Sequence, residues 1–267
     1  MEQYLQYVWL IPLGFFAGAY GTIIGAGGGF VLVPVLLLLY PRESPETITS
    51  ISLAVVFFNA LSGTLAYARA KRIDYRSAII LAIASIPGAV LGALATSRVN
   101  REAFDLLFGF ILIFVALFLG LNPGPKTAST AAQLAAGRPR FLELRVSALI
   151  AGALLSTVLG FISSFLGIGG GFMYVPALIS LLRFPVQTAT VTSLFILTVT
   201  TFTGSATHVA AGLFHGGMRR AIMLSFGAVV GAQVGVKIAA RIKDYWIVRV
   251  LAITLGLVGL RIIVSAL

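Results

Sequence analysis

Apolar residues run in long charge-free windows along most of this chain, and charged residues fall in the short gaps between them. A helix needs about 20 apolar residues to cross the hydrocarbon core of a bilayer, so each long window predicts membrane-spanning structure. We therefore expect eight hydrophobic modules, at about 5–40, 47–68, 77–97, 103–121, 146–182, 187–211, 218–240 and 245–266.

The modules form two similar halves. The glycine-rich phrase 25–30, followed by Val33-Pro34, returns as the phrase 167–172, followed by Val175-Pro176. Further matches keep nearly the same spacing, so we expect a single domain over 1–267, with a first repeat over 1–121, a linker loop over 122–144 and a second repeat over 145–267. The further matches pair Thr47–Leu53 with Thr188–Leu194, Ser62–Thr64 with Thr203–Ser205, and Gly88–Gly92 with Gly231–Gly235.

The first module of each half is too long for one ordinary helix, and three consecutive glycines interrupt it. Each glycine weakens a helix by roughly 1 kcal/mol relative to alanine, which predicts a break at both places. If the broken module crosses once, the protein has eight spans and two halves of the same orientation. If it enters and returns, there are ten segments and inverted halves.

Loop charge decides weakly between these two topologies. A cytoplasmic loop is indicated by Arg69, Lys71, Arg72 and Arg76, and basic residues near 237–249 prefer the same side in inverted halves. Arg219 and Arg220 would then face outside, which argues against inversion. We favour inverted repeats with a central site, in an all-α polytopic membrane protein.

Composition supports this class. Hydrophobic residues are 59% and charged residues 10% of the chain, and the mean hydropathy is +1.03, whereas soluble domains are about 25% charged. The net charge of +11 reflects basic loops rather than nucleic-acid binding. There is no cysteine, which excludes disulfides and thiolate metal sites. We expect no cofactor and no metal.

The paired breaks are the first candidate binding site. Gly27, Gly28, Gly29 and Gly169, Gly170, Gly171 leave backbone N–H groups free at the start of a helix, where partial positive charge gathers. Without a Cβ, an anion can approach such a backbone closely. The alternative is that these glycines only allow close packing of helices.

Hydroxyl-rich modules supply the second candidate group. Ser52 and Asn59 in the first half, with Thr192 and Ser193 in the second, are the residues that we expect to face a cavity and contact substrate. Hydroxyl and amide donors can replace water around an oxyanion without adding a fixed charge. Most of the neighbouring Ser and Thr residues are expected to bond their own helix backbone instead.

Acidic residues are absent from the middle of every window, so a proton-driven mechanism has few candidates. His208 is a candidate proton relay, although we favour the alternative that it is a hydrogen-bonded residue at a helix end, because it aligns with Tyr67 of the first half. An intramembrane enzyme is not expected, because there is no HExxH motif and no convincing Ser/His pair with an orienting acid. A non-transporting membrane scaffold stays as a third class.

The chain resembles the TauE/SafE family of sulfite and organosulfonate exporters over nearly its whole length. The residues that carry the resemblance are the two glycine phrases with Val-Pro, Thr192-Ser193-Leu194 with its partner Ile51-Ser52-Leu53, and Gly63–Tyr67 leading to Ile73-Asp74-Tyr75. The resemblance implies a multi-pass protein of the bacterial or archaeal cytoplasmic membrane. Ile51 replaces the family's Thr in the first half, which implies that the two halves are not equivalent.

The leading hypothesis is therefore a membrane transporter that exports a small oxyanion, sulfite or an organosulfonate such as sulfoacetate. The alternative is sodium- or proton-coupled uptake of a small sulfur-containing or carboxylate anion. The expected partners are the anion and the lipid bilayer, with no nucleic acid, and a homo-oligomer is left open.

Overall fold

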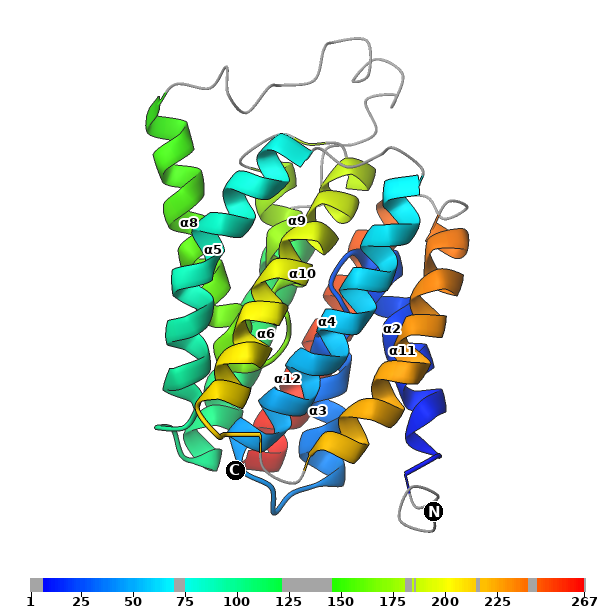
Figure 1. The fold of residues 1–267 in the computed structure, drawn as a ribbon, viewed down its shortest axis with the longest axis vertical. Coiled ribbons are helices and arrows are strands. Elements are labelled where there is room, and N and C mark those ends of the chain that lie inside the picture. Colours follow the sequence, from blue (N-terminus) through cyan, green and yellow to red (C-terminus); the bar gives the residue numbers. More distant parts are fainter. Residues whose placement is uncertain are drawn as a thin grey trace.

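The computed structural model describes residues 7–69, 75–121, 146–180, 184, 186–214, 217–239 and 244–266. Within these residues the chain forms ten α-helices and no strand (Figure 1). The predicted linker loop 122–144 lies outside the described residues. The helices are α2 Leu10–Ile24, α3 Gly29–Leu39, α4 Pro45–Arg69, α5 Tyr75–Thr96, α6 Arg101–Leu121, α8 Val146–Leu166, α9 Gly171–Ser180, α10 Val186–Ala210, α11 Met218–Ala239 and α12 Asp244–Ala266.

Both long first modules are interrupted at their glycines, as the sequence predicted. Helix α2 ends at Gly25, which takes a left-handed conformation with φ of 79°, while the next N–H, of Ala26, bonds to the Gly21 carbonyl at 2.8 Å. This is the usual way in which a glycine closes a helix. Gly28, also left-handed, then caps the start of α3.

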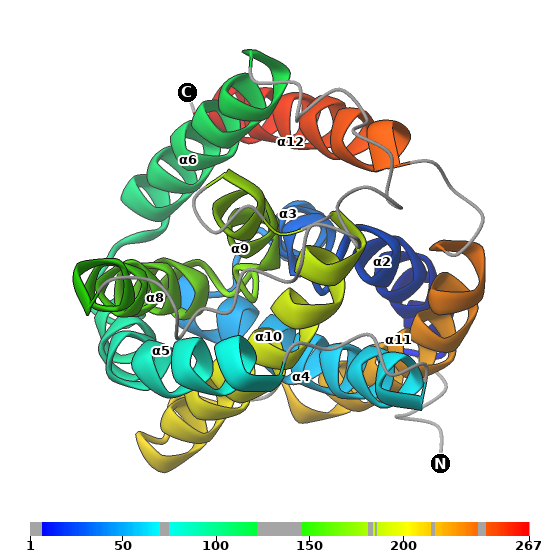
Figure 2. The same cartoon turned by 90° about the horizontal axis from the view of Figure 1, so that it is seen from above.

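The two short helices return towards the end from which their modules came. In Figure 1, α2 rises from the N-terminal end of the molecule and α3 runs back towards it, whereas α8 descends from the opposite end and α9 returns there. Seen from above, α3 and α9 lie in the interior, enclosed by α6 and α12 on one side and by the other long helices around the rest (Figure 2). Phe30 and Phe172, near their starts, are fully buried.

Small residues make the closest helix contacts. A Cβ on Gly227 would overlap the carbonyl oxygen of Ile11, and one on Gly231 would overlap that of Phe15, so α2 and α11 run parallel with their backbones in contact. Helices α5 and α8 repeat this contact, because Gly88 and Gly92 face the carbonyls of Thr157 and Phe161. Such seams drive helix association where lipid removes the hydrophobic driving force.

The outer surface is apolar, as a membrane protein requires. Phe16, Phe110, Phe114 and Phe226 are each more than 60% exposed, an arrangement that is costly in water but favourable against lipid tails. Four of the described helices are long and apolar enough to cross a membrane. They comprise Pro45–Ala68, Tyr75–Thr96, Thr188–Ala210 and Met218–Ala239.

Gly231→Ala tests the seam between α2 and α11. The new methyl group would meet the Phe15 carbonyl and force the helices apart, with an expected cost of roughly 1–3 kcal/mol for overpacking. The purified protein should unfold at a lower temperature in detergent. Gly120→Ala in α6 is the matched control, because a Cβ there meets nothing within 4 Å. Equal melting temperatures for the two variants would contradict the seam.

Candidate functional site

The two glycine breaks meet each other in the interior. A Cβ on Gly29 would overlap the carbonyl oxygen of Ile168, and a Cβ on Gly171 would overlap that of Gly25. Each short helix therefore begins against the break of the other half. The six candidate glycines, Gly27, Gly28, Gly29, Gly169, Gly170 and Gly171, are thus brought to one place in the fold.

Left-handed backbone is what requires glycine inside each break. Gly27 and Gly28 have φ of 76° and 79°, and Gly169 and Gly170 have φ of 86° and 73°. A residue with a side chain pays roughly 1–2 kcal/mol in this conformation. The packing adds a second reason at Gly28, where a Cβ would overlap the Ala17 carbonyl.

Helices α4 and α10 cross beside the breaks. Val56 of α4 and Leu197 of α10 each reach the space next to both Gly27 and Gly169. The helices are antiparallel there, since Gly63 faces Leu194 while Gly204 faces Leu53. In this structure two apolar side chains therefore fill the space between the breaks and the middle of these helices.

The four hydroxyl and amide candidates are all fully buried, but they are bonded differently. Ser193 Oγ lies 2.8 Å from the carbonyl oxygens of both Gly25 and Thr190, which ties α10 to the first break. Asn59 Oδ1 accepts a hydrogen bond from Thr22 at 3.3 Å. Ser52 Oγ, Asn59 Nδ2 and Thr192 Oγ1 have no hydrogen-bond partner in the protein.

Three further hydroxyls near the breaks share this lack of a partner. Ser163 Oγ and Ser164 Oγ belong to the last turn of α8, where Ser163 packs on Gly170, and Thr190 packs on Gly25. Buried polar atoms are normally paired with protein or ordered water, so a group of unpaired donors around one place needs an explanation. Six such residues lie on helices that meet the breaks: Ser52, Asn59, Ser163, Ser164, Thr190 and Thr192.

Sequence reasoning missed the serines of α8. Their signal was present, because Ser164 stands at the position in the second half that Thr22 occupies in the first, three residues before the glycine phrase. Thr22 and Ser164 both approach the α4 and α10 crossing, through Asn59 and Gly204 respectively. A repeat alignment extended to these positions would have identified them.

Most other hydroxyls bond their own helix, which confirms that interpretation of the threonine-rich module. Thr198, Thr200, Thr201, Thr203 and Thr207 each donate to the carbonyl four residues earlier. These residues satisfy α10 internally and are not free to bind a substrate.

His208 lies apart from the breaks, in the last turn of α10. It is buried, and its Nδ1 is hydrogen-bonded to Ser50 Oγ, which also lies 2.6 Å from the Glu46 carbonyl. Its Nε2 has no partner. Thr201, which packs on Gly169, stands seven positions before it, about 10 Å along the helix. The role of His208 as a proton relay stays a prediction.

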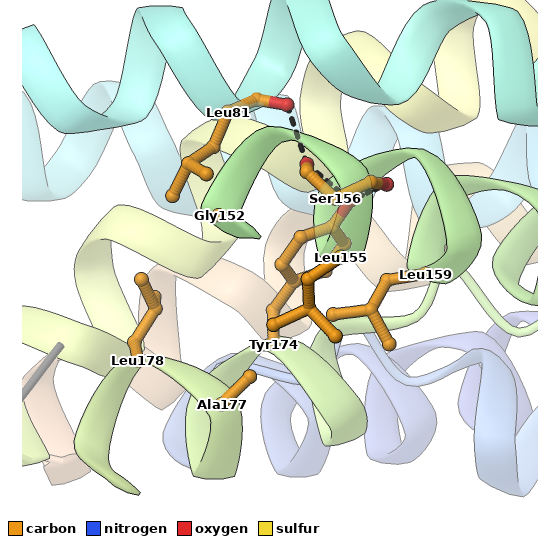
Figure 3. A pocket seen from close by; sticks show the side chains of 8 residues that line it. All are labelled: Leu81, Gly152, Leu155, Ser156, Leu159, Tyr174, Ala177 and Leu178. Carbon is orange, nitrogen blue, oxygen red and sulfur yellow. Dashed lines mark hydrogen bonds between the residues drawn. The ribbon is translucent and has the colours of Figure 1, made fainter. Parts of the chain in front are cut away.

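A small cavity lies between α5, α8 and α9 (Figure 3). Its volume is ≈ 30 Å³, and its polar groups are already bonded, with Ser156 Oγ donating to the Leu81 carbonyl at 2.6 Å and Tyr174 OH to the Ser156 carbonyl at 3.0 Å. This cavity can hold a water molecule or two but offers no free donor to an anion. Its lining consists of Leu81, Gly152, Leu155, Ser156, Leu159, Tyr174, Ala177 and Leu178.

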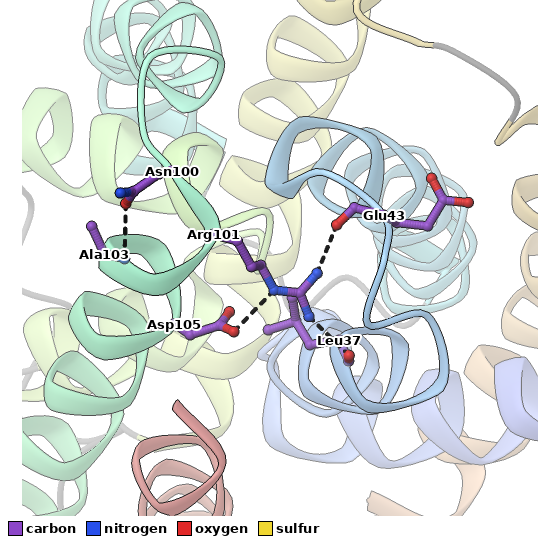
Figure 4. A network of polar contacts seen from close by, with 6 residues as sticks. All are labelled: Leu37, Glu43, Asn100, Arg101, Ala103 and Asp105. Carbon is purple, nitrogen blue, oxygen red and sulfur yellow. Dashed lines mark hydrogen bonds and ion pairs between the residues drawn. The ribbon is translucent and has the colours of Figure 1, made fainter. Parts of the chain in front are cut away.

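Charged side chains gather at the end of the bundle where α3 finishes and α6 begins (Figure 4). Arg101 bonds Asp105 through Nε at 2.9 Å, the Glu43 carbonyl through Nη1 at 2.7 Å and the Leu37 carbonyl through Nη2 at 2.8 Å. It therefore fixes the loop between α3 and α4. Among the described residues no cluster of three His, Asp or Glu side chains could hold a metal ion.

Ser193→Ala and Ser52→Ala are equivalent substitutions in the two repeats, and they should differ. Ser193→Ala removes the link to the Gly25 and Thr190 carbonyls and should cost about 1 kcal/mol of stability. Ser52→Ala removes no hydrogen bond and should leave the melting temperature in detergent unchanged or slightly raised. Equal losses in the two variants would show that the two serines are bonded alike.

Comparison with known proteins finds relatives over nearly the whole chain. The family described as "Sulfite exporter TauE/SafE" matches residues 10–262. The "Probable membrane transporter protein YunE" of Bacillus subtilis is 35% identical over 97% of this chain and 98% of its own length. The "Probable membrane transporter protein MJ0441" of Methanocaldococcus jannaschii is 25% identical over 94% and 93%. No solved structure matches the chain. With its paired glycine breaks and apolar helices, this chain belongs to the TauE/SafE family of multi-pass membrane transporters.

Proposed function

We propose that this transporter exports a small oxyanion, sulfite or an organosulfonate such as sulfoacetate, through a central site at the paired glycine breaks. The observation that carries the proposal is the group of buried donors without partners on the helices that meet those breaks. Hydroxyl and amide hydrogens there, together with the first N–H groups of α3 and α9, can replace the water around an oxyanion.

The chemistry of these groups suits a singly or doubly charged oxyanion of small size. The neutral donors stabilise negative charge without holding it permanently, so that the anion can leave again. The helix starts add partial positive charge. Val56 and Leu197 fill the neighbouring space in this structure, so the proposal requires these two side chains to move when substrate binds.

We also propose that the two halves are inverted repeats in the membrane. In Figure 1, α2 and α8 run in opposite directions, as do α4 and α10. Arg69, Arg76 and Lys237 stand at the same end of the bundle, and the connections there carry further Lys and Arg in the sequence. On the rule that basic loops remain inside, we propose that this end faces the cytoplasm.

Arg220 at the opposite end had argued against this orientation. Its guanidinium pairs with Glu43 at 2.6 Å and is largely buried, so it does not act as a free loop charge. The main sequence argument against inversion is thereby weakened.

Export follows from the electrical driving force. An inside-negative potential favours anion exit by about 2.3 kcal/mol per charge per 100 mV, and the apolar windows contain no carboxylate of the kind that proton pumps use. The second candidate is uptake coupled to sodium or protons. The buried His208, bonded to Ser50, is the observation that favours a proton-coupled form.

Proteoliposomes loaded with sulfite test the proposal, with potential, sodium gradient and proton gradient imposed separately. Potential alone should drive sulfite efflux. Flux that requires a sodium or proton gradient would instead support coupled transport. If neither sulfite nor sulfoacetate moves under any gradient, the oxyanion proposal is wrong.

Ser52→Ala and Asn59→Ala should each slow this flux by about ten- to hundredfold, the range for losing a hydrogen bond to a charged group. Ser97→Ala is the control, since its exposed hydroxyl only bonds the nearby Leu94 carbonyl. Melting temperatures of the variants separate lost binding from lost folding. Unchanged flux in both site variants would move the site away from the α4 and α10 crossing.

Single cysteines test the orientation, because the chain has none of its own. Arg76 and Arg98 are both exposed and stand near opposite ends of α5. In intact cells an impermeant maleimide should label Arg98→Cys directly, and Arg76→Cys only after permeabilisation. The reverse pattern would invert the proposed orientation.

A further inference from the structure

The pair of Arg220 and Glu43 is bonded in an unusual way. Arg220 lies in the first turn of α11, and its side chain is only 8% exposed. Nη2 bonds Glu43 Oε1 at 2.6 Å, and the guanidinium carbon lies 4.5 Å from the centre of the Tyr40 ring. Nε and Nη1 are buried and have no hydrogen-bond partner.

A purely structural arginine would be bonded more completely. Arg101, which bonds the backbone carbonyl of the same Glu43, gives a comparison. Its side chain is 24% exposed, and all three of its nitrogens are bonded, to Asp105 and to two carbonyls. Arg220 is more deeply buried and yet leaves two nitrogens unused. A buried charge with unused donors is costly, so its retention calls for a ligand that the protein itself does not supply.

The fold does not require this charge. The position in the first half that corresponds to Arg220 is Ser77 on α5, and the position in the second half that corresponds to Glu43 is Phe184. Helices α5 and α8 pack as closely as α11 and α2 without an arginine at that point. The pair therefore belongs to one end of the molecule rather than to the shared architecture of the repeats.

Glu43 is placed so that its carboxylate can leave Arg220 and be replaced by another anion. Its carboxylate-bearing side chain is 33% exposed, whereas its carbonyl is held by Arg101. Release of the carboxylate from Arg220 needs only a side-chain rotation, with the loop still anchored. Burial raises the pKa of the Tyr40 phenol above its ordinary value, so the ring that covers Arg220 stays uncharged.

We infer that Arg220 is an anion-binding residue at this mouth of the transporter, where a small oxyanion displaces the carboxylate of Glu43. Two oxygens of one oxyanion can accept hydrogen bonds from two N–H groups of the guanidinium at once. The Glu43 carboxylate bonds Arg220 through a single oxygen and leaves this possibility unused. The anion would be the one named in the proposed function, on which this role of Arg220 rests. The site lies one short helix from the central breaks, since α3 has 11 residues and spans about 16 Å.

The competing carboxylate has a kinetic purpose in this arrangement. An arginine alone would hold an oxyanion tightly and slow its departure. The Glu43 carboxylate binds the Arg220 guanidinium again as the anion leaves. Because one carboxylate is exchanged for one oxyanion, the buried positive charge of Arg220 always has a negative partner.

Glu43→Gln gives the decisive test in proteoliposomes with sulfite as the probe. Removing the competitor should lower the half-saturating sulfite concentration by about tenfold and also lower the maximal flux, because release is slowed. Glu102→Gln is the matched control, since it removes an exposed charge at the same end. A half-saturating concentration that is unchanged or raised in Glu43→Gln would overturn the inference.

Arg220→Gln and Arg220→Lys complete the test. Both substitutions should weaken sulfite binding. Lysine keeps the positive charge but lacks the planar guanidinium, which can bind two oxygens at once. The control Arg98→Gln, at an exposed position, should leave sulfite binding unchanged. Heat stabilisation of the detergent-purified protein by sulfite, against chloride at equal ionic strength, measures binding without transport. If the Arg220 variants do not fold, Glu43→Gln decides alone.

The two failures are distinguishable. If sulfite stabilises Glu43→Gln against heat at lower concentrations than it stabilises the parent protein, but no anion is transported, then the binding site is supported and the proposed function is wrong. Sulfite flux with no effect of Glu43→Gln on its concentration dependence would retain the function and remove the site.

Discussion

The contact between the two glycine breaks is the constraint on which the rest of the structure depends. Each short helix starts against a backbone carbonyl of the opposite break, at Ile168 for α3 and at Gly25 for α9. No side chain fits at these contacts, so the glycines are required sterically as well as conformationally. Interrupted backbone can exist at membrane depth only when protein surrounds it or when it lines a wet cavity. The long helices that enclose α3 and α9 meet this requirement.

That enclosure binds the two halves into one unit. The first helix of each half packs against the fourth helix of the other, α2 on α11 and α8 on α5, through glycines in backbone contact. Side chains from both halves also cover each break, since Val56 and Leu197 both lie beside Gly27 and Gly169. In lipid, where burial of apolar surface offers no advantage, close approach of small residues is what holds such a bundle together.

The repeats share their backbone plan but differ in their polar groups. Ser193 is bonded to the opposite break while its counterpart Ser52 is not, and Tyr174 stands where the first half has Leu32. The charged pair of Arg220 and Glu43 occurs at one end alone in the described structure, since Ser77 replaces the arginine at the other. A similar backbone plan in the two halves therefore carries unlike polar groups.

Sequence alone determined the membrane class, the duplication and the position of the helix breaks, because hydrophobic length and glycine content act locally along the chain. It also identified the hydroxyl-rich helices, and it predicted that most of their threonines bond their own helix backbone. Tertiary structure alone decided that the two breaks touch, that Val56 and Leu197 lie against them, and which donors are left without a partner. A repeat alignment extended to Ser164 would have drawn attention to the serines of α8. It would not have shown that they lack a hydrogen-bond partner, since a serine that is bonded and one that is free read alike in a sequence, and nothing in the sequence marks Arg220 as a partly bonded residue. Whether a donor is satisfied depends on atoms brought from distant segments, and only the packing of helices against one another fixes those neighbours.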